Sequence, residues 1–302
     1  MKTICLEANP QAEGLRIDKF IAVECPDMSR SFIQKHIKDG KCFVNGKAVK
    51  SSYQIQLSDQ IRLEVPDAIM PDILAEDIPL DIIFEDEDLL IVNKPKNMVV
   101  HPANGHYSGT LVNAIMYHCK EQLSGINGVM RPGIVHRIDK DTTGSLIICK
   151  NDFSHNHIAM QLKEHTIDRR YRAIVHGVLA EDEGTIDAPI GRDEKDRLKM
   201  AVNHKNGKQA VTHFKVLKRF DKYTYIECKL ETGRTHQIRV HMASIGHPLL
   251  GDSLYRAPSV PFKLSGQTLH AMHLGLVHPR TNEYMEFDAP LPDYFTHLLS
   301  IL

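Results

Sequence analysis

The sequence predicts an α+β protein whose larger part is built on a mixed, largely antiparallel β-sheet flanked by helices. Three observations support this fold class. Expected helices and strands follow one another without the regular strand–helix alternation of a parallel sheet. Two neighbouring segments, residues 213–220 and 223–230, alternate well enough to be paired antiparallel strands. The N-terminal segment instead suggests short helices and one hairpin, which indicates a separate small domain.

Length and composition restrict the class of protein. The chain has 302 residues, enough for one large domain and a small one. No apolar run approaches a transmembrane span, and the N-terminus lacks the apolar block of a signal peptide, so we expect a cytoplasmic protein with no membrane partner. The six cysteines lie far apart without a Cys-x-x-Cys pair, which indicates buried thiols rather than a disulfide or zinc framework.

The formal net charge of -1 hides an uneven distribution. Residues 16–50 carry eight Lys or Arg against four Asp or Glu, a local charge of +4. Residues 66–88 carry nine acidic residues and neither Lys nor Arg. A basic module therefore precedes an acidic connector. We expect a first domain at residues 1–70, an acidic linker at 71–85 and a larger domain at 86–302.

The basic module is predicted to contain two helices and a hairpin. Apolar spacing indicates a first helix near residues 15–24, and Ser29 or Ser31 is a candidate cap for a second. Asn-Gly at 45–46 between two apolar pieces is a hairpin signal, and residues 60–65 are expected to form the closing strand. Such a module is too small for a catalytic cleft of its own.

The larger domain begins with a strand and a helix and ends with two late strands. Ser154 is the expected cap of its second helix. The expected strands are 88–93, 146–150, 169–177, 213–220, 223–230, 274–277 and 284–288, and the expected helices are 110–119, 154–165 and 236–245.

One stretch, residues 131–145, is a basic, turn-rich loop in which an acid, Asp139, stands between Arg137 and Lys140. Cationic neighbours favour the ionised carboxylate, so we expect a lowered pKa for Asp139. That suits a nucleophile or a charge stabiliser better than a proton donor. An ordinary structural loop with ion pairs is the alternative. Asp141, two residues further on, competes for the role of the catalytic acid.

The residues of this loop also carry a family resemblance. His136-Arg-Ile-Asp139 with Thr142-Thr-Gly144 resembles the H-R-[LI]-D-x-x-T-[ST]-G signature of the RluA-type pseudouridine synthases, and most closely their RluD-like members that act on large-subunit ribosomal RNA. Three further segments are similar in order, and pieces of the N-terminal module resemble an S4 (αL-type) RNA-binding domain. These matching segments are residues 15–20, 40–46, 93–95, 170–173 and 231–241.

The resemblance implies a role for each matched residue. Asp139 would be the catalytic aspartate, Tyr171 the tyrosine over the target ring and Arg239 the salt-bridge partner of Asp139. Ile238 would form an apolar wall, and Arg137 would fill the space that the base leaves. The signature's His136 is grouped with these positioning residues. The S4-like module implies RNA-binding roles for Arg16, Lys19, Arg30, Lys35, Lys38 and Lys41.

The implied reaction is the isomerisation of uridine to pseudouridine, which breaks the C1′–N1 bond, rotates the uracil and joins C5 to C1′. It needs no redox change, so we expect no cofactor and no metal. The target base must leave its stack, at a cost of roughly a few kcal/mol. Asp139 could attack C1′, attack the ring, or assist a glycal route. The resemblance implies 23S ribosomal RNA as the partner, with the helix 69 loop as the target, and we expect a monomer.

Several alternatives remain at this stage. Tyr171 could be a core tyrosine, and Arg239 a surface arginine of a helix. Residues 233–235 could form a phosphate cradle. His236, His241, His270, His273 and His278 invite a zinc hypothesis, but no Cys or acid completes a ligand spacing. The rival functions are modification of another rRNA or tRNA uridine, a non-catalytic RNA-binding assembly factor, and a carboxylate-based hydrolase of small molecules.

Overall fold

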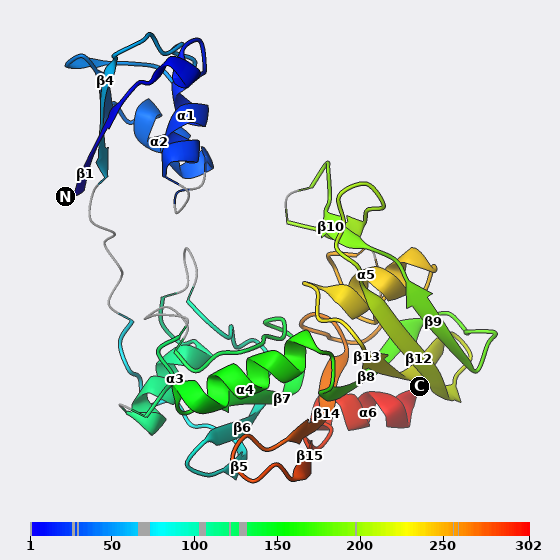
Figure 1. Ribbon diagram of the computed structural model, residues 1–302. Coiled ribbons are helices and arrows are strands. Elements are labelled where there is room, and N and C mark those ends of the chain that lie inside the picture. Colours follow the sequence, from blue (N-terminus) through cyan, green and yellow to red (C-terminus); the bar gives the residue numbers. More distant parts are fainter. Residues whose placement is uncertain are drawn as a thin grey trace. The chain divides into compact units, whose positions relative to one another are not determined.

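The computed structural model describes residues 2–25, 28, 30–65, 73–102, 107–120, 122–126, 132–196, 198–255, 257–258 and 260–302 (Figure 1). The chain divides into two compact units, Met1–Asp72 and Ile73–Leu302. The expected linker 71–85 is wrong from residue 73 onwards. Ile73 is buried in the core of the second unit, and strand β5 (Ile82–Glu85) belongs to its sheet.

The first unit packs two helices against a small antiparallel sheet in the order β1-β4-β2-β3. Asn45 and Gly46 both have positive φ, 49° and 81°, as expected for the tight turn that the Asn-Gly pair predicted. The first strand, β1, was not predicted. The elements are β1 (Lys2–Glu7), η1 (Pro10–Ala12), α1 (Ile17–Glu24), α2 (Arg30–Lys38), β2 (Cys42–Val44), β3 (Lys47–Ala48) and β4 (Gln60–Val65).

A buried carboxylate ties the two helices of the first unit together. Asp18 on α1 is fully buried and accepts hydrogen bonds from Arg16, Arg30 and Gln34. Burial alone would raise its pKa, but these three donors outweigh burial and lower the pKa of Asp18 to about 2. Arg16 and Arg30, both expected to bind RNA, are therefore about half exposed and also hold this carboxylate.

The second unit is organised around a nine-stranded sheet with the order β5-β6-β7-β14-β8-β13-β12-β9, and β15 pairs with β14 (Figure 1). Only the β7–β14 pair is parallel among the pairs of this sheet that the structure describes, so the predicted mixed, largely antiparallel sheet is confirmed. A two-stranded hairpin, β10–β11, stands apart from it. The strands are β6 (Leu89–Lys94), β7 (Thr143–Cys149), β8 (Asp168–His176), β9 (Glu183–Asp187), β10 (Ile190–Arg192), β11 (Met200–Val202), β12 (Val211–Arg219), β13 (Tyr223–Leu230), β14 (Leu269–Val277) and β15 (Tyr284–Asp288).

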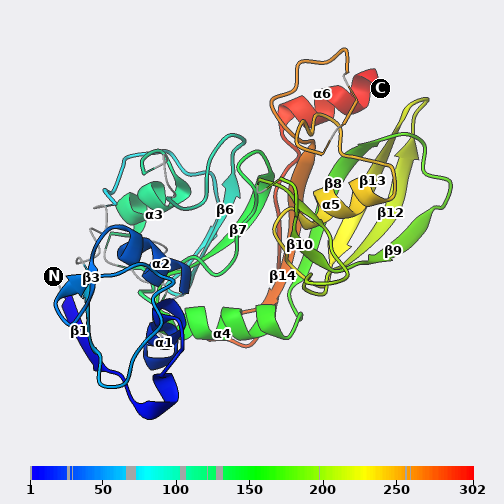
Figure 2. The same cartoon turned by 90° about the horizontal axis from the view of Figure 1, so that it is seen from above.

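Four helices flank this sheet: α3 (Leu111–Cys119), α4 (Asp152–Lys163), α5 (Gln237–Ser244) and α6 (Asp293–Ile301) (Figure 2). Helix α4 packs on β7, and α5 packs on β12 and on β11. The predicted cap Ser154 is wrong, because Asn151 is the N-cap and its side chain accepts the Ser154 N–H. Helix α6 was not predicted. In the described parts of the chain, no helix is both long and apolar enough to cross a membrane.

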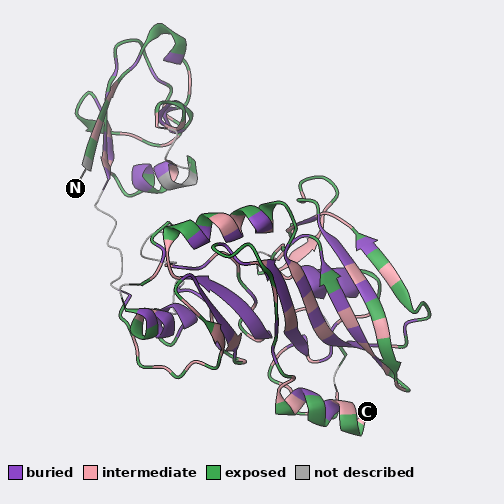
Figure 3. Ribbon diagram, turned by 60° about the horizontal axis from the view of Figure 1, so that its bottom comes forward, coloured by how far each residue is buried: buried purple, intermediate pink, exposed green. Residues whose placement is uncertain are grey.

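The centre of the sheet is where the signature loop enters it. Strands β7 and β14 meet through the pairs His270↔Thr143 and Ala271↔Gly144, and both strands are largely buried there (Figure 3). Gly144 has a φ of 109°, and a Cβ there would overlap the backbone of Ala271. Glycine is therefore required for the two strands to approach, and the preceding loop is fixed at the middle of the sheet.

Candidate active site

A cavity of about 480 Å³ lies where the loop before β7 meets β8 and α5. All six residues of this unit that the sequence analysis singled out line it: His136, Arg137, Asp139, Tyr171, Ile238 and Arg239. Asp141, the competing acid, is not among its lining residues. The Asp141 carboxyl instead packs against Gly266, where an added Cβ would come within 2.6 Å of it. The structure thus distinguishes the two acids of the loop by their surroundings.

Asp139 and Arg239 form an ion pair across one hundred residues of sequence. Arg239 Nη1 donates to Asp139 Oδ2 at 2.9 Å. The arginine side chain is 8% exposed and the carboxylate 18%, and both residues line the cavity. An arginine at this distance favours the ionised carboxylate and fixes its orientation.

A second carboxylate, Asp252, holds the far side of Arg239. Arg239 Nε donates to its Oδ2 at 2.6 Å, and Nη2 donates to its Oδ1 at 3.0 Å. Burial disfavours the charged guanidinium, but Asp252 and Asp139 outweigh burial and raise the pKa of Arg239. Asp252 was not predicted. Its only sequence signal is an acid two residues after the apolar pair Leu249-Leu250, which does not indicate a partner.

His236 approaches Asp139 from the start of α5. Its Nε2 lies 3.8 Å from Asp139 Oδ1, and its Nδ1 lies 2.8 Å from the hydroxyl of Tyr255. The same hydroxyl accepts the backbone N–H of Met200 on β11 at 3.0 Å. His236 has a φ of 57°, an uncommon left-handed conformation for a residue with a side chain. Tyr255 therefore connects the β10–β11 hairpin to the histidine that faces the carboxylate.

We predict that Tyr255→Phe lowers the rate of product formation roughly fivefold, because it removes the hydrogen bonds of this hydroxyl to His236 and to the Met200 N–H. Burial lowers the pKa of His236, so the ring is neutral at neutral pH and the hydrogen bond orients it. Single-turnover rates between pH 6 and 9 measure the effect. Tyr223→Phe is the matched control, because the ring of Tyr223 packs against His176 and Phe262 and not against His236. Equal rates for wild type and Tyr255→Phe would contradict an orienting role.

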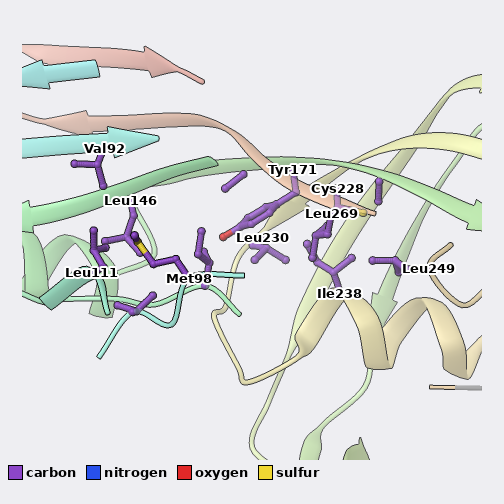
Figure 4. Packing of buried hydrophobic residues seen from close by; sticks show 14 of the residues in the cluster. Val92, Met98, Leu111, Leu146, Tyr171, Cys228, Leu230, Ile238, Leu249 and Leu269 are labelled. Atoms are coloured by element: carbon purple, nitrogen blue, oxygen red, sulfur yellow. The ribbon is translucent and has the colours of Figure 1, made fainter. Parts of the chain in front are cut away.

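Tyr171 lies on β8 at the floor of the cavity, beside Leu230, Leu269 and Ile238 (Figure 4). Its side chain is buried, with 8% of the residue exposed. Burial raises the pKa of Tyr171; Arg169 lowers it and Asp139 raises it. The phenol is thus neutral near pH 7. It presents an aromatic surface, and it is unsuited to act as an unassisted base.

Two side chains hold the signature loop in place. His136 Nε2 accepts the backbone N–H of Ile147 on β7 at 3.0 Å, and burial with the charge of Arg169 lowers the pKa of His136 to about 3. Nε2 of His136, a predicted positioning residue, is therefore already hydrogen-bonded to strand β7. Lys94 is fully buried, and its Nζ donates to three backbone carbonyls, including that of Lys140 at 3.0 Å. Burial lowers the pKa of Lys94 to about 7, against the charges of Asp141 and Asp139.

The histidines that suggested zinc have other partners. His241 bonds to Thr212 and Ala188, and His270 bonds to Thr143 and Ala289. Within the described residues, no group of three His, Cys, Asp or Glu side chains is placed to hold a metal ion. The residues that line the cavity include a carboxylate paired with Arg239, an aromatic ring and apolar side chains.

Comparison with known proteins agrees with this geometry. Residues 88–244 match the model of the RNA pseudouridylate synthase family, and residues 15–61 match the S4 domain. The chain is 55% identical over 302 residues to an uncharacterised RNA pseudouridine synthase of Bacillus subtilis, covering 100% of this chain and 99% of that protein. It is 46% identical over 300 residues to ribosomal large subunit pseudouridine synthase D of Zymomonas mobilis, covering 96% and 94%.

Solved structures extend the similarity. Human RNA pseudouridylate synthase domain containing 1 superposes with a TM-score of 0.58 at 26% identity, covering 72% of this chain and 85% of that chain. The chain belongs to the RNA pseudouridine synthase family and carries an S4 domain in front of its catalytic unit.

Proposed function

We propose that this enzyme converts uridines of 23S ribosomal RNA to pseudouridine, in the helix 69 region, with Asp139 as the catalytic group. The relatives named ribosomal large subunit pseudouridine synthase D, in Zymomonas mobilis and Pseudomonas aeruginosa, cover 96% of this chain at 46% and 45% identity. The observation that carries the proposal is the ion-paired carboxylate of Asp139, which faces a cavity floored by Tyr171.

The reaction is an isomerisation, so its atoms balance within the nucleotide. The C1′–N1 bond breaks, the uracil turns, C5 bonds to C1′, the C5 proton leaves and N1 gains a proton. Attack on C1′, attack on the ring, and the glycal route all require an ionised, desolvated carboxylate near the sugar. Arg239 supplies the positive charge that favours the ionised state of Asp139.

Three residues are placed to handle the flipped base. Tyr171 offers a buried ring on which the uracil stacks while it turns, and Ile238 closes the apolar side of the cavity. Arg137 is exposed and lines the same cavity, so it can enter the space that the base leaves in the RNA. Flipping costs roughly a few kcal/mol, which the stacking and the arginine offset.

Mapping pseudouridines in ribosomal RNA from cells with and without this gene tests the proposal. We expect one or a few 23S positions in the helix 69 region to lose the modification, and to regain it when the gene is restored. Restoring the Asp139→Asn variant should not recover them. Loss of pseudouridine at a different ribosomal or transfer RNA position would identify that uridine as the target instead. An unchanged pseudouridine map would refute the proposal.

The S4 unit is expected to add RNA affinity through its exposed lysines. Replacing Lys19, Lys35 and Lys38 by Gln should weaken binding of 23S RNA fragments and reduce the salt dependence of log K by roughly 2–3 units, because each lost phosphate contact removes about 0.7–0.9. Titrations at several salt concentrations measure this slope. The matched control replaces three exposed lysines of the second unit that do not line the cavity, Lys215, Lys218 and Lys222. If the slope of log K against log salt concentration were equal for both triple variants, the proposal that the S4 unit binds RNA would be wrong.

A further inference from the structure

Arg169 is a buried cation without a carboxylate partner. It lies on β8, it is 6% exposed, and it lines the cavity. Its Nη2 donates to the backbone carbonyl of Glu231 at 3.1 Å, whereas its Nε is buried and has no hydrogen-bond partner. Among the residues that the structure describes, no Asp or Glu side chain lies within 4.0 Å of its guanidinium.

The other buried arginine of the cavity is treated very differently. Arg239 has two carboxylates around its guanidinium, as expected for a charge that is removed from water. Arg169 is also removed from water, but its hydrogen-bond partner is a backbone carbonyl and not a carboxylate. Burial therefore lowers the pKa of Arg169. An arginine nonetheless stays protonated in proteins. An uncompensated buried charge that faces a binding cavity indicates an anionic group that arrives with the ligand.

The position of Arg169 suits a group adjacent to the flipped base. Arg169 and Tyr171 are two residues apart on β8, so their side chains lie on the same face of the sheet, about 6–7 Å apart along the strand. Both line the cavity, together with the cationic side chains of Lys163 and Arg234. The anion would therefore bind about one strand step from the ring on which the uracil stacks.

Gly233 provides the space for this guanidinium. A Cβ at position 233 would lie 2.7 Å from Arg169 Nη1, closer than side chains tolerate. The sequence suggested that residues 233–235 cradle a phosphate through backbone N–H groups. The structure indicates a different role for Gly233. Because this residue has no side chain, the guanidinium of Arg169 can lie close to the Gly233 backbone beside the cavity.

We propose that Arg169 binds a backbone phosphate of the RNA, on the 5′ or the 3′ side of the flipped uridine. The proposal rests on the proposed function only in placing the target uridine in this cavity. A phosphate fits better than a uracil oxygen, because only an anion compensates the buried charge. The phosphate would bond to the guanidinium, whose charge has no carboxylate partner within the described ranges of the chain, and would anchor the nucleotide while the base rotates. Arg169 is thus a substrate-binding residue, distinct from the Asp139–Arg239 pair.

Neutral linkages in the substrate test this contact. A 23S stem-loop that the wild-type enzyme modifies is made with a single methylphosphonate on the 5′ or the 3′ side of the target uridine. Single-turnover rates are measured against enzyme concentration. We expect wild type to lose roughly 10- to 100-fold in apparent affinity at one of the two positions, as for a hydrogen bond to a charged group. Equal affinity for all three RNAs would overturn the proposal.

Variants then assign the contact to Arg169. Arg169→Met should lose a similar factor on the natural RNA, and the methylphosphonate should cause no further loss. Arg169→Lys should retain part of the affinity and part of the sensitivity to the neutral linkage. Gly233→Ala, which keeps the arginine but displaces it, should reduce that sensitivity. If the losses from Arg169→Met and from the methylphosphonate simply multiply, the phosphate binds elsewhere.

A matched control separates binding from folding. Arg170→Met removes the next arginine on the same strand, which pairs with Asp168 and does not line the cavity, so it should leave the methylphosphonate effect unchanged. Because Arg169 is uncompensated in the free enzyme, Arg169→Met should not lower the melting temperature, and a large decrease would make Arg169 a structural residue. If wild type modifies no uridine of the RNA, the proposed function fails. If wild type modifies the target uridine equally well with the natural and the neutral linkages, only this inference fails.

Discussion

Asp139→Asn is expected to slow pseudouridine formation by roughly 10³-fold or more, the order of magnitude for removing a group that takes part in the chemistry. Asparagine has nearly the same shape, but it has no charge and cannot act as the nucleophile or base. Arg239 keeps Asp252 as its partner in this variant, so the fold should survive. The rate is measured with enzyme in excess over RNA, so that slow product release does not mask the chemical step.

Asp141→Asn is the matched control for this prediction. It removes a carboxylate from the same loop, two residues further on, which packs against Gly266 outside the cavity. Its rate should stay close to that of wild type. RNA binding by Asp139→Asn should also stay close to wild type, because Tyr171 and Arg137 remain. A fast Asp139→Asn variant beside an inactive Asp141→Asn variant would reverse the assignment of the two acids.

The larger elements of the fold were predictable because each carries a local signal. The alternating pattern of residues 223–230 gave strand β13 with its observed bounds, and Asn45-Gly46 gave the hairpin of the first unit. The missed strands β5, β10 and β11 have only three or four residues, too few for an alternating pattern to separate them from loops. β5 pairs with the neighbouring strand β6, and β10 pairs with β11, and the propensity of so short a segment does not encode that pairing.

The residues of the candidate site were likewise predictable only in part. Asp139, Tyr171 and Arg239 were named through a resemblance, and the structure brings them into one cavity. Asp252 and Arg169 were missed, because their importance depends on which residues surround them in the folded protein. Asp252 has a buried arginine as its partner, and Arg169 has no carboxylate partner in the described part of the chain. Neither residue stands in a pattern with a fixed spacing. The expected pKa of a side chain follows from its neighbours in space.

Arg239 illustrates why structure changes the prediction that its position alone suggests. A surface arginine of a helix could be removed with little loss of folding. The observed Arg239 is buried between two carboxylates, and its removal would leave Asp252, which is 1% exposed, without a counter-charge. We therefore expect Arg239→Gln to lose activity by at least roughly 10²-fold and to lose about 3–5 kcal/mol of stability, as for other broken buried pairs.

A second substitution separates these two effects. Adding Asp252→Asn to Arg239→Gln neutralises the buried charge and retains an oxygen for the Leu254 N–H, so most of the lost stability should return. Activity should not return, because Asp139 still lacks the guanidinium that orients it. Hydrogen exchange of the α5 and β14 amides in the full chain reports the stability of this region, and single-turnover rates report the activity. Recovery of both in the double variant would show that Arg239 serves folding alone. Recovery of stability without activity would show that the same arginine both balances Asp252 and prepares Asp139 for reaction.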